Sequence, residues 1–133
     1  MPTPPSFFAE YDDRTQRLRY INCGHLPALL LCADGSLKKL DSTCTVLGLF
    51  DEWDCAIRDF SLSPGDTLAI YTDGITEAFN TREEEFGEER LIEALRCPEL
   101  TPRELLDSVV ERVREFSPGE QADDITLIVA RCR

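Results

Sequence analysis

The sequence predicts an α+β fold, in which an antiparallel β-sheet has helices packed on one face. Three observations carry this prediction. Short apolar or alternating runs, separated by turn residues, fill about the first 70 positions. Two later segments repeat apolar residues at helical spacing, and a final run rich in β-branched residues closes the chain.

Composition indicates one domain and excludes some partners. The chain has 133 residues, of which 42% are hydrophobic, enough to bury a core. Its 14 basic and 26 acidic residues give a net charge of −12, which argues against nucleic acid and anionic membranes as partners. The apolar runs are far shorter than the roughly 20 residues of a membrane-spanning helix, and the first residues carry no secretory signal.

The six cysteines are scattered and show no CxxC pair, and a single histidine cannot complete a zinc set. We expect them to be reduced and structural in a cytoplasmic protein. One exposed redox-active thiol is the alternative. The cysteines are Cys23, Cys32, Cys44, Cys55, Cys97 and Cys132.

The first half is expected to form an antiparallel meander. The runs SFFAEYD and QRLRYINCG flank a turn at 12–15, and the runs ALLLCA and SLKKL flank the hairpin pair Asp34-Gly35. The run WDCAIRDFSL follows as another strand, closed by the turn SPGD, and TLAIYTD comes directly after it. Short connections favour antiparallel pairing.

The second half changes to helical period. GEERLIEALRC and TPRELLDSVVERVREF each place apolar residues on one face. Thr101 as N-cap, Pro102 at the first helical position and Glu104 in a capping box mark the start of the second helix. The last strand, in DDITLIVARCR, is apolar almost throughout, so we expect it to lie centrally in a sheet covered on both faces.

Acidic residues stand at the ends of two apolar strands. Asp73 ends one strand beside Gly74, and a helical turn rather than a returning strand follows; Asp123 and Asp124 directly precede another. If these strands are antiparallel neighbours, the carboxylates meet at one edge of the sheet, an arrangement that suits Mg²⁺ or Mn²⁺. Alternatively, Asp73 is a helix N-cap and Asp123 part of a turn. The residues alone leave both interpretations open.

Four segments in order resemble the SpoIIE-type bacterial branch of the metal-dependent protein phosphatases, the PPM superfamily. They are FFAEYDDRTQRLRYINCGHLPALLL, PGDTLAIYTDGITEAFN, FGEERL and ADDITLIVARCR. The resemblance covers most of the chain and implies a partial αββα sandwich. It places His25, the only histidine, in a structural turn rather than in catalysis.

The resemblance also implies the chemistry. Asp73 and Asp123 match the family's metal ligands, with Asp124 and Gly74 in supporting roles. Two Mn²⁺ or Mg²⁺ ions in the complete domain activate a water as nucleophile, so no side chain needs to be catalytic. The implied activity is that of a serine/threonine protein phosphatase in sigma-factor regulation, and the implied substrate is a phosphoprotein such as an anti-sigma-factor antagonist.

The family's N-terminal D-x-S-G-H-G motif does not occur in this sequence. We therefore expect residues 1–133 to be the C-terminal portion of a phosphatase domain, inactive alone and holding metal weakly or not at all. The alternative is a non-catalytic, phosphatase-like module that binds a signalling regulator. Loss of the N-terminal part should expose a sheet edge and apolar surface, which favours a homodimer.

Overall fold

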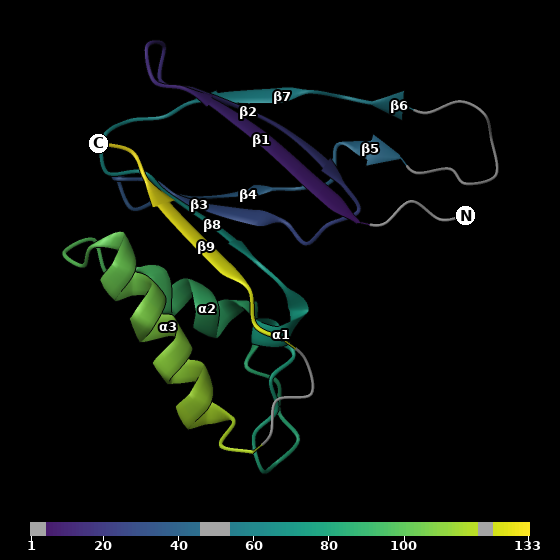
Figure 1. Cartoon of the computed structure of the whole chain (residues 1–133), viewed down its shortest axis with the longest axis vertical. Helices are drawn as coiled ribbons and strands as arrows, with labels where there is room; N and C mark the ends of the chain where they lie inside the picture. Colours follow the sequence, from purple (N-terminus) through teal and green to yellow (C-terminus); the bar gives the residue numbers. More distant parts are fainter. Residues whose placement is uncertain (1–4, 46–53, 120–123) are drawn as a thin grey trace.

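Two larger antiparallel sheets, a two-stranded ribbon and a layer of helices make up the part of the fold that the structure describes (Figure 1). The computed structural model describes residues 5–45, 54–119 and 124–133. Within them, one sheet has the strand order β1-β2-β7, a second has the order β4-β3-β8-β9, and β5 pairs with β6. The elements are β1 (Ser6–Asp12), β2 (Arg17–Cys23), β3 (Ala28–Leu31), β4 (Leu37–Leu40), β5 (Cys44–Thr45), β6 (Asp54–Cys55), β7 (Arg58–Ser61), β8 (Thr67–Tyr71), α1 (Asp73–Thr76), α2 (Gly87–Leu95), α3 (Pro102–Phe116) and β9 (Leu127–Arg131). The predicted α+β class is confirmed.

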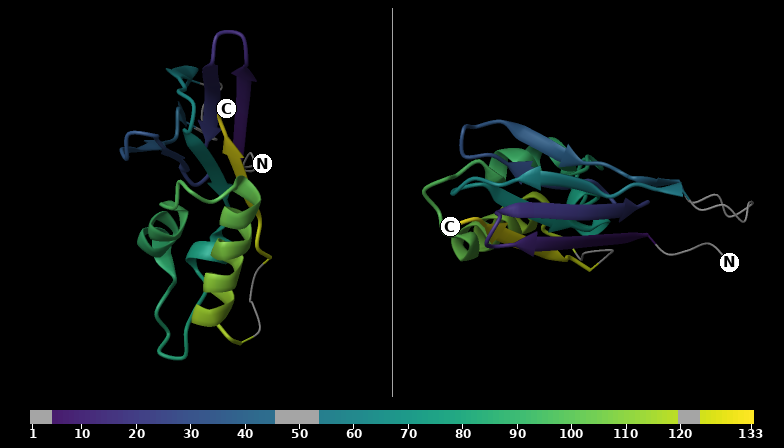
Figure 2. Two further views of the ribbon diagram at one scale, coloured as in Figure 1. Left: turned by 90° about the vertical axis from the view of Figure 1, so that its left-hand side faces the viewer. Right: turned by 90° about the horizontal axis from the view of Figure 1, so that it is seen from above.

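The four-stranded sheet is the middle layer and packs on both faces. Successive residues of β3 point to opposite sides: Leu29 belongs to the core against the helices, whereas Ala28 and Leu30 belong to the core between the sheets. This double burial explains why the ALLL run is apolar without alternation. The outer face of the β1-β2-β7 sheet, in contrast, carries no helix among the described residues, as the view from above shows (Figure 2).

Local signals in the sequence produce the expected hairpins and helix start. At the β3–β4 turn, Asp34 Oδ1 accepts from the backbone N–H of Ser36 at 2.8 Å, and Gly35 has φ of 91°. The capping box of α3 is complete, since the Thr101 side chain accepts from the Glu104 N–H and the Glu104 side chain accepts from the Thr101 N–H. No helix among the described residues has the length and apolar character to span a bilayer.

The single meander expected for the first half is wrong where the chain changes sheet. β7 pairs with β2, while β8 pairs with β3 and β9, so these two consecutive strands lie in different layers. The turn at 62–66 therefore connects two sheets instead of closing a hairpin. A turn motif specifies a change of direction over four residues, and it does not specify which distant strand the chain joins next.

The last strand also departs from expectation. β9 is an edge strand whose only strand partner among the described residues is β8, and Ile128 is 54% exposed. Leu127 and Val129 pack against the helical core, so one face is covered as predicted. The prediction of a central strand covered on both faces was wrong, because an apolar run records the need for burial but not how many neighbours the strand has.

The expectation that every cysteine is reduced is wrong at one position. Cys44 is disulfide-bonded, and in the β5–β6 register it lies opposite Cys55. Free thiols occur at Cys23, Cys32, Cys97 and Cys132. Cysteines 11 residues apart in the chain become cross-strand neighbours only when β5 and β6 pair, which their spacing does not reveal.

Asp66 stabilises the turn through which the chain passes from one sheet to the other. Its side chain is only 6% exposed, and its two carboxylate oxygens accept from the backbone N–H groups of Ala33 and Ser63, both at 2.8 Å. Its own carbonyl accepts from Cys132 N–H at 2.9 Å. One residue thus ties the β3–β4 turn, the sheet crossing and the chain after β9 together.

We predict that Asp66→Ala lowers the free energy of unfolding by about 2–4 kcal/mol, because it removes the charged acceptor of two part-buried backbone hydrogen bonds. Urea unfolding monitored by circular dichroism measures the loss. Asp34→Ala is the matched control, since Asp34 also accepts hydrogen bonds in a turn but is exposed. Equal losses in the two variants would contradict the role given to Asp66.

Candidate metal centre

The predicted meeting of two strand ends is present in the structure. β8 and β9 pair antiparallel, and Tyr71 opposite Leu127 is the last register pair. Beyond this pair, Thr72 N–H donates to the Thr126 carbonyl at 3.2 Å, and Thr126 N–H donates to Thr72 Oγ1 at 3.1 Å. The end of β8 and the start of β9 therefore lie side by side, next to α1 (Figure 1).

Gly74 brings the two acidic segments into backbone contact. A Cβ built on Gly74 would lie 2.2 Å from the carbonyl oxygen of Asp124 and 2.9 Å from its carbonyl carbon. No side chain fits at that separation, so glycine is required for close approach rather than for an unusual φ. The Asp-Gly pair and the start of the closing strand, far apart in sequence, form one local structure.

Asp73 is the first residue of α1, and its side chain is exposed. Thr72 occupies the N-cap position, so the alternative that Asp73 is the helix N-cap is wrong. The backbone around Asp73 is nevertheless firmly held, because Tyr71 and Ile75 on either side are buried in the same core. The arrangement presents a carboxylate to solvent from a rigid support, which is favourable for ligand binding.

The described residues supply part of a site for a hard cation. Asp124 is exposed like Asp73, and its backbone touches Gly74; Asp123 lies outside the described residues. In the part of the chain that the structure describes, no group of three or more His, Cys, Asp and Glu side chains could hold a metal. The exposed carboxylates of Asp73 and Asp124 are the type of oxygen ligand that Mg²⁺ and Mn²⁺ prefer. Asp73 alone does not complete a ligand set.

A polar network that sequence reasoning missed lies directly behind this edge. Tyr71 Oη donates to Glu88 Oε2 at 3.0 Å, and Lys39 Nζ pairs with Glu88 Oε1. Tyr71 is 2% exposed. The network joins β8, α2 and β4, and the signal that could have found it is the tyrosine that ends the aliphatic run Leu-Ala-Ile.

Electrostatics keep the network in one protonation state. The hydrogen bond from Lys39 holds the pKa of Glu88 below its ordinary value, partly offset by burial, and the Tyr71 hydroxyl lowers it further. Burial, then the hydrogen bond to Glu88, raises the pKa of Tyr71. The hydrogen bond to Glu88 raises the pKa of Lys39 despite partial burial. Glu88 is therefore an ionised acceptor between two protonated donors at neutral pH.

His25 has structural contacts, as expected. Its backbone N–H donates to Asn22 Oδ1 at 2.9 Å, and its ring Nδ1 lies 2.9 Å from the Leu26 carbonyl oxygen. Asn22 is fully buried, and its side-chain amide donates to the Leu40 carbonyl at 3.0 Å. This turn connects the two sheets through β2 and β3, and it contributes no group to the acidic edge.

Comparison with known proteins identifies the family. The family model described as Stage II sporulation protein E (SpoIIE) matches residues 5–133. The chain belongs to the SpoIIE family. The resemblance to the SpoIIE-type family that the four sequence segments indicated is thereby confirmed.

Individual relatives agree with this assignment. The chain is 35% identical over 123 residues to Protein IcfG of Synechocystis, covering 92% of this chain and 19% of IcfG. It is 28% identical over 130 residues to the phosphoserine phosphatase RsbU of Bacillus subtilis, covering 94% of this chain and 38% of RsbU. It thus spans well under half the length of these two relatives.

A solved structure shows the same fold. The phosphatase domain of SpoIIE from Bacillus subtilis, in its Mn-presoaked form, matches with a TM-score of 0.71 at 22% identity. The match covers 96% of this chain and 56% of that domain. The SpoIIE-family fold therefore extends across nearly all of the chain, which corresponds to about half of that solved domain.

The pKa shifts in the network lead to a prediction about pH. Because the pKa of Glu88 is lower in the folded protein, its stabilisation is fully present above the ordinary value of 4.5 and is lost as pH falls through the folded value. The stability difference between the wild type and Glu88→Gln should be constant near neutral pH and shrink below pH 4.5. Urea unfolding from pH 3 to 7 tests this, and a difference that grows toward low pH would refute it.

Proposed function

We propose that the protein containing this chain is a metal-dependent serine/threonine protein phosphatase, with Asp73 and Asp123 as metal ligands. The observation that carries the proposal is the contact of Gly74 with the Asp124 carbonyl, because it brings the two acidic motifs to one edge. Membership of the SpoIIE family and the similarity to RsbU, a phosphoserine phosphatase, support the reaction class.

Each residue of the edge has a distinct role in this proposal. The Asp73 and Asp123 carboxylates bind the cation, and Asp124, whose carbonyl lies against Gly74, has a supporting role. Gly74 permits the approach of the two segments. When bound, Mn²⁺ or Mg²⁺ lowers the pKa of a water and stabilises the charge of the phosphoryl group. No side chain of this chain acts as nucleophile in the proposal.

We further propose that residues 1–133 form the C-terminal portion of the phosphatase domain. The coverage of 56% of the solved SpoIIE domain supports this view. With Asp73 and Asp123 as its protein ligands, the chain alone would bind one ion weakly and would not assemble the pair of ions, because such cations prefer about six oxygen ligands.

The proposed substrate is a phosphorylated regulatory protein in the cytoplasm. An anti-sigma-factor antagonist fits the partner-switching role that membership of the SpoIIE family suggests. The second candidate is a non-catalytic module that binds such a regulator without cleaving it. The absence of the D-x-S-G-H-G motif from the sequence favours this alternative for the isolated chain.

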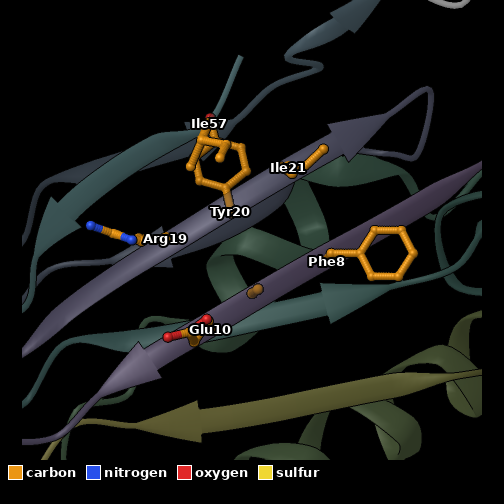
Figure 3. Close-up of a pocket in the computed structure, with 7 residues that line it drawn as sticks. Phe8, Glu10, Arg19, Tyr20, Ile21 and Ile57 are labelled. Atoms are coloured by element: carbon orange, nitrogen blue, oxygen red, sulfur yellow. The ribbon is translucent and has the colours of Figure 1, made fainter. Parts of the chain in front are cut away.

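Self-association is proposed through the uncovered face of the β1-β2-β7 sheet. A groove of about 310 Å³ lies there, and Phe8 and Ile57 on its walls are 63% and 66% exposed (Figure 3). Glu10 and Arg19 also line it and are register partners. A two-fold arrangement can therefore set Glu10 of each copy opposite Arg19 of the other, and the apolar residues become buried. The exposed edges of β1 and β9 offer strand exchange as a second route.

The first test concerns activity. The chain should show no appreciable Mn²⁺- or Mg²⁺-dependent release of phosphate from a phosphoserine peptide, and a longer protein with the D-x-S-G-H-G motif should recover it. In that longer protein, Asp73→Asn or Asp123→Asn should lower kcat steeply while leaving thermal stability nearly unchanged. Asp34→Asn is the control at the other Asp-Gly pair. Equal losses at Asp34 and Asp73, or full activity of the chain alone, would overturn the proposal.

The second test concerns assembly. Light scattering should give a mass above that of the monomer at high protein concentration, and Phe8→Lys should return it toward the monomer because a charge then occupies the apolar groove. Phe79→Lys is the matched control, since Phe79 is 50% exposed on another part of the surface. A wild-type protein that stays monomeric would contradict the proposal, and association unaffected by Phe8→Lys would point to the strand edges.

A further inference from the structure

We propose that Glu88 is a positioning residue for the metal-binding edge, and that it acts through Tyr71 on the strand end that carries Asp73. The inference rests on the proposed function, because it assigns residues that orient the same cation site. Neither Glu88 nor Tyr71 is itself offered as a ligand.

The first step is the geometry of the anchor. Glu88 stands in the first turn of α2 and uses one oxygen for Tyr71 Oη, at 3.0 Å, and the other for Lys39 Nζ. Three elements that are separate in sequence are thereby fixed to one carboxylate. A displacement of β8 relative to α2 would break a hydrogen bond, whereas purely apolar packing would allow small shifts.

The second step is the short distance along the chain from the anchor to the site. Tyr71 is the last residue of β8, and only Thr72 separates it from Asp73. Thr72 is itself bonded to Thr126 on the neighbouring strand segment. No flexible loop intervenes, so the position of the Tyr71 ring determines where the Asp73 backbone lies.

The third step explains why the position needs a hydroxyl. A phenylalanine ring would fill the same core without requiring any partner, while a buried tyrosine hydroxyl costs free energy unless it is paired. Glu88 supplies the acceptor, and Lys39 keeps Glu88 ionised. Such a buried polar contact selects one arrangement of the strand end, which is the property that a metal site of fixed geometry requires.

The experiment measures Mn²⁺ binding by the chain itself. Paramagnetic broadening of the amide NMR signals of Gly74 and Ile75 is followed as Mn²⁺ is added, with a two-dimensional spectrum to verify that each variant is folded. Tyr71→Phe and Glu88→Gln should each raise the Mn²⁺ concentration at half-maximal broadening by about tenfold. This is the lower end of the loss in metal affinity that follows when a residue supporting the metal ligands is removed. The double variant should lose less than the sum of the two single variants, because Tyr71→Phe removes the hydrogen bond that Glu88→Gln weakens by making its acceptor neutral.

Tyr11→Phe is the matched control. Its hydroxyl lies 3.2 Å from Cys132 Sγ, at the end of β9 opposite to the acidic edge, so its removal should leave Mn²⁺ binding unchanged. If Tyr71→Phe does not fold, Glu88→Gln carries the test, because Glu88 is 30% exposed and tolerates an isosteric amide. Broadening curves for folded Tyr71→Phe or Glu88→Gln that superimpose on that of Tyr11→Phe would overturn the inference.

A further variant separates this inference from the proposed function. Asp73→Asn should abolish the broadening in the wild-type background. If it does, and the network variants bind as tightly as the control, the metal site stands and the positioning role fails. If Asp73→Asn leaves the broadening unchanged, the proposed metal site fails and the positioning role fails with it. If the wild-type chain shows no broadening up to millimolar Mn²⁺, the chain holds no cation for Glu88 to position, and the inference fails while the proposed function of the longer protein stands.

Discussion

The pairing of β8 with β9 and the contact at its end hold the candidate metal centre of this molecule together. Five register pairs align the two strands from Thr67 opposite Arg131 to Tyr71 opposite Leu127. Where the ladder ends, Gly74 lies so close to the Asp124 carbonyl that a Cβ would be 2.2 Å from it. Any larger residue at 74 would push the strand ends apart and move Asp73 with them.

The middle sheet can support this edge because both of its faces are packed. Ala69 and Tyr71 of β8 face the helical core, and Leu68 and Ile70 pack toward the core between the sheets. Asp66 fixes the other end of β8 through two backbone N–H groups. The strand is thus held at both ends and on both faces, which limits the freedom of the short segment that follows it.

Hydrogen-bonded carboxylates and freely exposed carboxylates have different roles here. Asp66 and Glu88 have their oxygens satisfied by backbone or side-chain donors, and they hold elements in place. Asp73 is exposed on a rigid support, and this exposure leaves its charge available to a cation. In a chain with 26 acidic residues, burial and hydrogen bonding separate structural acids from candidate ligands better than residue type does.

The sequence by itself determined what a few neighbouring residues can encode. The hairpin at Asp34, the capping box at Thr101 and the helical turn after Asp73 were predictable because turn and cap hydrogen bonds form within four residues. It also predicted that the segments of Asp73 and of Asp123 and Asp124 meet at one sheet edge if their strands are antiparallel neighbours, and β8 and β9 are such neighbours.

Only the tertiary structure decided which strands share a sheet. β7 and β8 separate into two layers, β9 lies at an edge, and Glu88 meets Tyr71 and Lys39 from different elements. These outcomes depend on strand pairing and side-chain packing between residues far apart in the chain. The free energies of alternative pairings compete, and the most favourable combination over the whole molecule is formed. A local pattern of apolar and polar residues does not record the result of that competition.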